Sequence, residues 1–306
     1  MLKYFVKRSA SEHYQPISTP PSENVWVRGE EATAEDLESL SERYGFNLNV
    51  FRDVLDQNEL PRVEVRDGNL YVFVRSATRG RHGRVTTMPV LLAVKKDVFV
   101  SLSAASITEY DHAVSGVPIA LHDTNSLMLG MIATIVSQYE ELMQHTARSI
   151  HDTGQRLRTH EVTNDDFIRF ATVEDNLNEY KMNLEGMLVV AERLKETFRA
   201  NGDAEAIEDI CLYIRQLLVA LGSYGQTIIS IRNAYGTIAN NVLNQRMKTL
   251  TVLTLLVALP NVFYGMYGMN ISLPFADQPW AYMAILGFTI IVVVMVFAIA
   301  RKKNIF

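Results

Sequence analysis

Cysteine is nearly absent from this chain, since Cys211 is the only one among 306 residues. A single cysteine excludes an intramolecular disulfide and any metal site built from several thiolates. Cys211 is therefore interpreted as a small residue inside a helix. An excess of basic residues is also missing, because 29 lysines and arginines face 34 aspartates and glutamates. The charge balance thus gives no indication of a nucleic acid partner.

Motifs of catalysis are missing as well. The sequence has no glycine-rich phosphate-binding loop, and its 7 histidines form no convincing catalytic or zinc-binding pattern. We therefore do not expect an enzyme. The first residues, Met1–Gln15, lack the apolar segment of a signal peptide, so no cleavable signal is expected.

Two apolar runs lie near the C-terminus. Residues Thr249–Met269 carry no charge over roughly twenty residues, enough to cross a lipid bilayer as a helix. The second run, Pro279–Ala300, is almost wholly apolar. Basic residues flank the two runs on one side, namely Arg246, Lys248, Arg301, Lys302 and Lys303. The loop Ile271–Gln278 has none, so the positive-inside rule places both termini in the cytoplasm and this loop outside.

The first span carries polar and small residues on one side only. We define the polar stripe as Asn244, Met247, Thr251, Thr254, Ala258, Asn261 and Gly265. Their alternating steps of three and four residues place them on one face of a helix. Polar groups inside a membrane usually face a bundle interior or water. The first span is therefore predicted to line a pathway and the second to face lipid.

Structural roles, with no part in a pathway, remain open for single residues of the stripe. The threonines Thr251 and Thr254 could bond to carbonyls of their own helix. Asn261 could satisfy a carbonyl that Pro260 leaves free. One helix cannot enclose a pore, so a pathway requires a symmetric homo-oligomer whose subunit number the sequence does not give.

The residues before the spans predict an α+β or α/β domain followed by long helices. A helix is expected over 34–58, and strands over Val63–Val65, Leu70–Arg75, Val90–Val94 and Val98–Leu102. Residues 123–158 and 163–200 are expected to form an antiparallel helical hairpin. An unbroken heptad pattern then predicts one continuous helix over about 203–268 that associates with other helices along its length.

The end of the first span carries a family resemblance. Tyr267-Gly268-Met269-Asn270 closes that span and is followed by a short loop, a second span and a basic tail, which resembles the CorA family of magnesium channels. Val50–Leu55 and Leu60–Glu64 are similar to a helix end and strand entry of the same family. The resemblance implies a funnel-shaped homopentamer in a prokaryotic plasma membrane. Without this context, Asn270 would simply cap a helix end.

The resemblance also implies roles for residues. Gly268, Met269 and Asn270 match the outer entrance that recruits hydrated Mg²⁺, and Met247 with Leu250 matches a hydrophobic constriction. The expected organisation is a cytoplasmic α/β domain over 1–122, long cytoplasmic helices over 123–202, a stalk helix continuing into the pore-lining span over 203–269, an external loop over 270–278, the second span over 279–300 and a basic tail over 301–306.

Asp53 and Asp209 match the resembled family's inter-subunit sensor for divalent cations. Bound Mg²⁺ would bridge two carboxylates there and hold the pore shut. The alternative is two ordinary surface acids. Many relatives have an acid before the aspartate, whereas this chain has Arg52, which makes an auxiliary ion site doubtful unless Glu208 compensates.

The expected function is Mg²⁺ uptake, with Co²⁺ or Ni²⁺ as further cargo and Mg²⁺ also as regulator. Two other functions compete with this one. The first is a zinc transporter of the related ZntB type, and the second is a membrane-anchored sensor or scaffold that conducts nothing.

Overall fold

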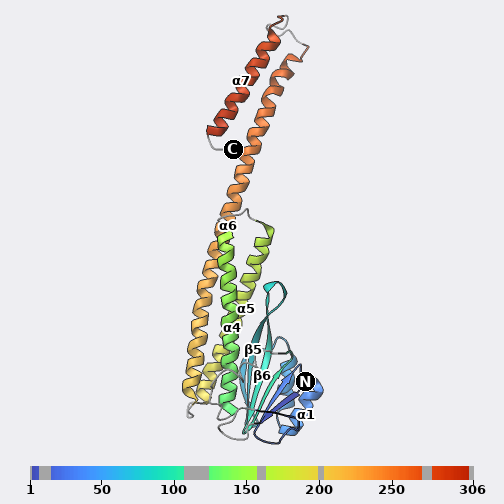
Figure 1. Cartoon of the computed structure of the whole chain (residues 1–306), viewed down its shortest axis with the longest axis vertical. Coiled ribbons are helices and arrows are strands. Elements are labelled where there is room, and N and C mark those ends of the chain that lie inside the picture. The colour runs from blue at the N-terminus through green and yellow to red at the C-terminus, as the bar shows by residue number, and fades with distance from the viewer. Residues whose placement is uncertain are drawn as a thin grey trace. The chain divides into compact units, whose positions relative to one another are not determined.

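The computed structural model describes residues 2–6, 15–106, 124–156, 163–198, 203–270 and 278–302. The chain divides into two compact units, Met1–Ile231 and Arg232–Phe306, and one long helix contributes to both. The first unit holds the sheet and most of the helices, whereas the second holds the two apolar segments (Figure 1).

A seven-stranded sheet forms the centre of the first unit. Its strands are β1 (Leu2–Val6), β2 (Gln15–Ile17), β3 (Val25–Glu30), β4 (Arg62–Arg66), β5 (Asn69–Arg79), β6 (Val85–Lys95) and β7 (Val98–Ser103), in the order β2-β1-β3-β7-β6-β5-β4. Neighbours are antiparallel except β3 and β7, which are parallel. The four strands predicted from the sequence are confirmed with longer bounds. Sequence patterns predict no element before residue 34, whereas three strands lie there.

Two short helices cover one face of the sheet. Helices α1 (Ala34–Tyr44) and α2 (Leu48–Arg52), with the 3₁₀ turn η1 (Asp53–Leu55), bury apolar side chains against the odd-numbered residues of β5. The prediction of one helix over 34–58 is wrong. The chain turns at Gly45, which has a left-handed φ of 70°, and the Lys95 ammonium donates to the carbonyls of Tyr44 and Gly45 at the end of α1.

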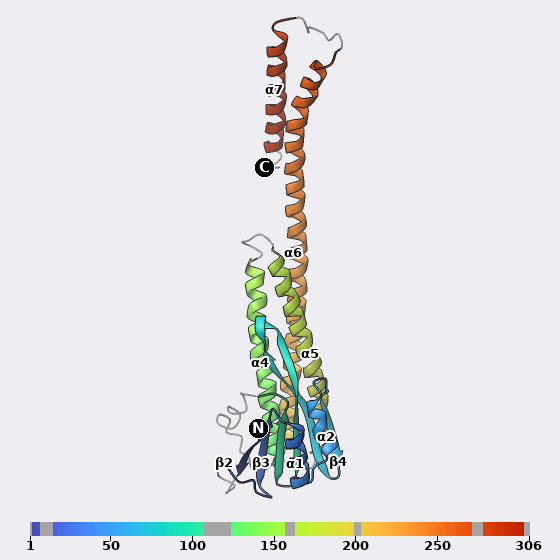
Figure 2. The same ribbon diagram turned by 90° about the vertical axis from the view of Figure 1, so that its right-hand side faces the viewer.

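Two long helices, α4 (Thr124–Arg156) and α5 (Asn164–Thr197), cover the opposite face (Figure 2). The Tyr139 hydroxyl donates to the Arg75 carbonyl at 2.9 Å, and the Ser76 hydroxyl donates to the Gln138 side chain at 3.1 Å. Successive strand residues point to opposite faces, so the even-numbered positions of β5 face α4. The first unit is thus a three-layer arrangement, and the predicted helical hairpin is confirmed.

Helix α6 (Ala204–Tyr267) is continuous, as the heptad pattern predicts. Most of its heptad residues in the first unit are buried, with Ile210, Ile214, Leu217, Leu221 and Ile228 at most 7% exposed, and Tyr224 and Ile231 are half-buried. In that unit α6 packs on the same layer as α4 and α5, since Arg215 pairs with Glu192 at 2.7 Å and the Tyr213 hydroxyl donates to Glu140.

Helix α7 (Ala281–Lys302) runs beside the C-terminal part of α6 in both views (Figures 1 and 2). The rings of Phe263 and Phe288 contact each other edge to face, with centroids 5.2 Å apart. Only 6% and 11% of the most apolar windows of α6 and α7 are buried. Packing within the chain therefore does not account for their apolar character, whereas a lipid environment does.

Candidate ion pathway and regulatory site

The polar stripe lies on the open face of α6. Every residue of the stripe is exposed, whereas the buried or half-buried positions of the same stretch are Thr249, Val252, Leu256, Leu259, Pro260 and Phe263. Phe263 contacts α7, so this second set marks the side of α6 that α7 covers. Successive helix residues are about 100° apart, which places the stripe on the side of α6 opposite α7.

The threonine hydroxyls of the stripe bond to their own helix. Thr251 donates to the Met247 carbonyl at 2.8 Å and Thr254 donates to the Leu250 carbonyl at 2.9 Å. The back-bonding interpretation is confirmed at both positions. A hydroxyl has one donor and two acceptor lone pairs, so each threonine oxygen can still accept a hydrogen bond from a water molecule.

The side chains of Asn261 and Asn270 make no hydrogen bond within the described part of the chain. The Asn261 side chain makes no hydrogen bond with any described residue, so the structure gives no support to the idea that it satisfies a carbonyl freed by Pro260. Across the described residues, the Asn270 side chain also has no hydrogen bond, and it caps no helix there. Both amides remain available to water or to another subunit.

The Gly268-Met269-Asn270 motif follows α6 as a tight end turn. The Gly268 N–H donates to the Tyr264 carbonyl at 3.0 Å and the Met269 N–H to the Met266 carbonyl at 3.2 Å. A Cβ on Gly268 would meet the Tyr264 oxygen at 3.4 Å, which is an ordinary contact. Within one chain, this position therefore does not require glycine.

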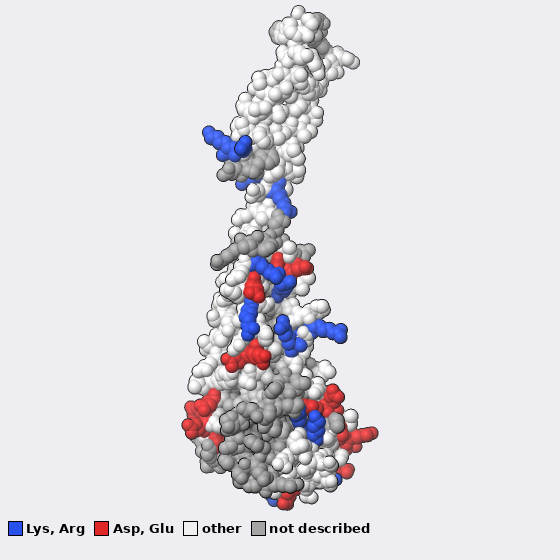
Figure 3. Space-filling model, viewed as in Figure 1, with Lys and Arg blue, Asp and Glu red and all other residues white. Residues whose placement is uncertain are grey.

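Basic side chains gather at one end of the antiparallel pair formed by α7 and the second-unit part of α6. These residues are Arg246, Lys248, Arg301 and Lys302, and Figure 3 shows blue side chains at this end of the pair. Residues 249–270 and 278–300 carry no charged side chain. Lys303 lies outside the described residues. This distribution is typical of the cytoplasmic side of a membrane protein.

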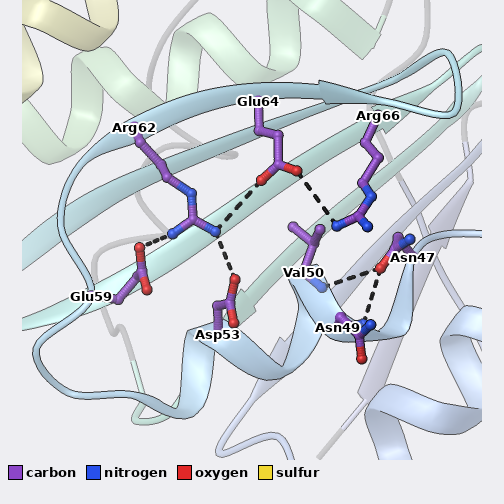
Figure 4. Close-up of polar contacts among 8 residues, drawn as sticks. All are labelled: Asn47, Asn49, Val50, Asp53, Glu59, Arg62, Glu64 and Arg66. Carbon is purple, nitrogen blue, oxygen red and sulfur yellow. Dashed lines mark hydrogen bonds and ion pairs between the residues drawn. The ribbon is translucent and has the colours of Figure 1, made fainter.

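Asp53 lies in a cluster of charges centred on Arg62 (Figure 4). The Arg62 guanidinium contacts Asp53 at 2.7 Å, Glu59 more closely still, and Glu64 at 3.6 Å. It also stacks over the Phe73 ring, 4.2 Å from the centroid. Arg66 contacts the other side of Glu64 at 3.8 Å. Within one chain, a cation therefore already occupies the position beside the predicted sensor carboxylate.

A buried arginine holds the loop that carries Glu59. Arg75 is 8% exposed, and its guanidinium donates to the Gln57 and Glu59 carbonyls at 2.9 and 2.7 Å and to the Thr87 hydroxyl. Sequence reasoning did not assign roles to Arg62 or Arg75. The sequence signal for these two arginines was weak, because both strands carry other polar residues, such as Glu64 in β4 and Ser76 in β5.

Asp209 lies on the exposed side of α6, in a groove of about 430 Å³ between α4 and α6. Its neighbour Glu208 accepts a hydrogen bond from Lys195 at 2.8 Å, and this contact lowers the pKa of Glu208. Arg52 similarly pairs with Glu38 at 2.6 Å. The positions considered for an auxiliary ion site are thus engaged in surface ion pairs.

The sheet separates Asp53 from Asp209 within one chain. Arg62, whose guanidinium contacts Asp53, lies directly opposite Phe73 in the antiparallel pairing of β4 with β5. Phe73 belongs to the core on the sheet face that α1 and α2 cover. Asp209 belongs to α6, which packs with α4 and α5 on the other face (Figure 1). Across the described residues, no three metal-binding side chains of His, Cys, Asp or Glu come together as an ion site. Any ion that joins the two aspartates must therefore join two copies of the chain.

Comparisons with known proteins agree with this architecture. The cobalt/magnesium transport protein CorA of Methanocaldococcus jannaschii is 22% identical over 310 residues, covering 92% of this chain and 90% of that protein. The complete structure of the CorA magnesium transporter from that organism matches with a TM-score of 0.84 at 18% identity, over 99% of this chain and 98% of that one. The ZntB cytoplasmic domain from Vibrio parahaemolyticus matches with a TM-score of 0.62 at 10% identity, over 78% of this chain and 98% of that one.

At these identities the structural matches show a shared fold. The family model described as CorA-like Mg²⁺ transporter protein matches residues 21–302, which is most of the chain. This chain therefore belongs to the CorA family, whose members are membrane transporters of divalent cations and not enzymes.

Proposed function

We propose that this protein is a magnesium channel in which first-span helices from five copies surround a pore. The observation that carries the proposal is the position of the polar stripe, on the face of α6 opposite α7. In this arrangement α7 lies between lipid and the membrane-spanning part of α6. The polar stripes, on the opposite side of each α6, therefore face the centre of the ring. The number five rests on the family.

The stripe offers amide and hydroxyl oxygens and no carboxylate. Mg²⁺ releases its water reluctantly, so neutral oxygens that bond to the hydration shell let the ion enter without stripping it. Weak binding at several levels also lets the ion leave. An inside-negative potential supplies about 4.6 kcal/mol per 100 mV for a divalent ion, twice the value for one charge.

In this proposal the two ends of the span have different roles. Gly268, Met269 and Asn270 form the external entrance, where exposed Asn270 amides bond to the water around the ion. Met247 and Leu250, which are 54% and 56% exposed in one chain, form a constriction that excludes water when the pore is closed. Residues 1–202 and the stalk part of α6 then lie in the cytoplasm, under a plasma membrane.

Regulation by cytoplasmic Mg²⁺ is the finer part of the proposal. Asp53 of one copy and Asp209 of the next share an ion that stabilises the closed ring, and loss of the ion leaves two carboxylates that repel each other. Arg62 competes with the ion for Asp53, because both are cations beside the same carboxylate. This competition sets how much Mg²⁺ is required.

The test is Mg²⁺ uptake into proteoliposomes under an inside-negative potential, with Asn270→Ala as the variant. We expect uptake by the natural protein and a loss of at least tenfold in Asn270→Ala, with assembly unchanged on size exclusion. Asn240→Ala, an exposed asparagine of α6 before the span, is the matched control and should transport normally.

Three results would contradict the proposal. Transport of Zn²⁺ without Mg²⁺ would favour the ZntB-type function. Absence of any ion flux from a correctly assembled protein would favour a non-conducting sensor. Normal uptake by Asn270→Ala would remove the motif from the entrance.

A further inference from the structure

An apolar groove lies in the second unit, between the C-terminal end of α6 and the start of α7. It measures about 290 Å³. We call it the aromatic groove, and the residues that define it are Phe263, Tyr267, Trp280, Ala284, Ile285 and Phe288. Four of these six side chains are aromatic and none is charged. Such a lining offers wide apolar contact and few polar groups, so it suits an apolar ligand.

The groove exists because α6 and α7 separate at this end. At the base of the groove the rings of Phe263 and Phe288 contact each other, and Phe263 is half-buried. Tyr267 lies one turn further along the same face of α6, yet it is 40% exposed. Pro260 lies inside α6 just before Phe263, and a proline inside a helix bends it. Figure 2 shows the end of α6 leaning away from α7. The two helices therefore open as a wedge that their own side chains do not fill.

Helix length places the groove at the edge of the hydrocarbon core of a membrane. Arg301, at the basic end of the pair, is about twenty residues from Ala281, which corresponds to about 30 Å of helix. The hydrocarbon core has about this thickness. Trp280, next to Ala281, therefore lies at the level of the head groups, where tryptophan is favoured. Phe288 lies two turns, or about 10 Å, deeper, at the level of acyl chains.

The groove is open to the medium beside α7. Trp280 and Phe288 are 52% and 53% exposed, and Ala284 between them is also exposed. Only 11% of the most apolar window of α7 is buried, so the surface that continues from the groove is itself a lipid-facing surface. An empty space at this depth would leave its lining without contacts on one side. Dispersion contacts therefore favour filling the groove with the hydrocarbon that surrounds it.

We propose that the aromatic groove binds one acyl chain of a membrane phospholipid. The chain lies along Ala284, Ile285 and Phe288, and the glycerol and the head group lie at the rim beside Trp280. The described lining contains no charged side chain that could select a head group, so recognition rests on the chain. On the topology that we propose, this lipid belongs to the outer leaflet.

The bound chain fills the space between α7 and the end of α6, close to the turn that Gly268 and Met269 form after Tyr267. It thus supports the end of the helix that carries the Gly268-Met269-Asn270 motif. Binding of the chain does not require that the protein conducts ions. The lipid site and the proposed channel can therefore fail separately.

The test is native mass spectrometry of the full-length protein, reconstituted in dioleoylphosphatidylcholine vesicles and then extracted into a mild detergent. We expect about one retained phospholipid per chain. Ala284→Phe should reduce this retention about threefold or more, because the added ring takes the volume of part of the chain. Ala298→Phe makes the same change at another exposed alanine of α7, nearer its basic end, and should retain the natural amount.

A smaller substitution and a second lipid complete the test. Ala284→Leu fills less of the groove and should give an intermediate retention, and melting curves establish that each variant is folded. Dioleoylphosphatidylglycerol should be retained as well as the phosphatidylcholine, since both have the same chains. A clear preference for one head group would overturn recognition through the chain.

Two other results would overturn the site itself. The first is equal retention of phospholipid by Ala284→Phe and the natural protein, or no retention by either. The second is a changed oligomeric state of Ala284→Phe on size exclusion with an unchanged lipid count, because side chains of a neighbouring copy would then fill the groove.

Discussion

At the scale of single residues, Arg62 is the main addition to what the sequence suggests. Its guanidinium lies beside Asp53, in the position of the bridging ion that we propose, and two glutamates and a phenyl ring hold it there. An arginine in this position keeps the carboxylates together in the absence of metal. It also opposes a second cation, since like charges repel in the same small volume.

Arg62→Gln is therefore expected to increase the apparent affinity for Mg²⁺ at the proposed sensor. The variant removes the competing charge beside Asp53 and Glu59, while Glu64 keeps its contact with Arg66. The measurement is the Mg²⁺ concentration that gives half-maximal thermal stabilisation, which should fall several-fold. Arg52→Gln, which breaks only the exposed pair with Glu38, is the control. An unchanged or raised Mg²⁺ requirement in Arg62→Gln would show that no such competition exists.

Gly45→Ala tests the turn that ends α1. Gly45 has a φ of 70°, and an added Cβ would lie 2.6 Å from the Lys95 nitrogen, so both the backbone and the lysine cap are disturbed. The left-handed backbone alone costs a residue with a side chain about 1–2 kcal/mol. The melting temperature should fall by roughly 2–8 °C. Glu42→Ala, on an exposed face of the same helix, should leave it within a degree or so, and an equal loss in both would contradict the argument.

At the scale of elements, α6 has two different faces in its membrane-spanning part. Thr251 and Thr254 lie on the exposed face. Val252 and Phe263 lie on the face that α7 covers, although all four residues belong to one apolar run. The second span also contains a threonine that bonds to its own helix, since Thr289 donates to the Ile285 carbonyl at 2.8 Å. Thr254 and Thr289 therefore differ in position but not in local bonding, which makes them a matched pair.

Thr254→Val is expected to reduce Mg²⁺ flux several-fold, because it removes an oxygen from the proposed pore wall without changing side-chain shape. Thr289→Val removes the same group from a 4% exposed position on α7 and should leave flux unchanged. Both are measured by Mg²⁺ uptake into proteoliposomes at equal protein content. If the two variants behave alike, the stripe does not line the pathway.

At the scale of the whole molecule, one copy leaves its proposed sites incomplete. The sheet lies between Asp53 and Asp209, and the polar stripe of a single α6 is exposed, uncovered by any residue that the structure describes. In the proposed symmetric assembly, one copy's Asp53 face would lie toward another copy's α6, and the stripes would close into a ring.

A disulfide test addresses this assembly. The double variant Asp53→Cys with Asp209→Cys, in a Cys211→Ser background, is expected to cross-link between chains under mild oxidation. Non-reducing gels should then show dimers and larger species that disappear on reduction. Each single cysteine variant is the control and should give far less of them. A product that stays monomeric after complete oxidation would contradict the inter-subunit arrangement.

The sequence alone determined the features that depend on local pattern. The continuous α6, the α4–α5 hairpin, four strands and both apolar spans follow from periodicity and length, because burying one face of an element imposes that periodicity along the chain. The stripe was visible for the same reason. Strands β1, β2 and β3 were missed because short strands contain too few residues to show a clear periodicity. The helix expected over 34–58 was too long because one residue, Gly45, ends α1.

Only the tertiary structure decided what lies next to what. It placed α7 against one side of α6, Arg62 beside Asp53, and the sheet between Asp53 and Asp209. It also brought Phe263 and Phe288, which belong to different helices, to the base of the aromatic groove. These contacts join distant segments, and no local periodicity encodes them. They depend on the three-layer packing of helices and sheet, which only the folded chain specifies.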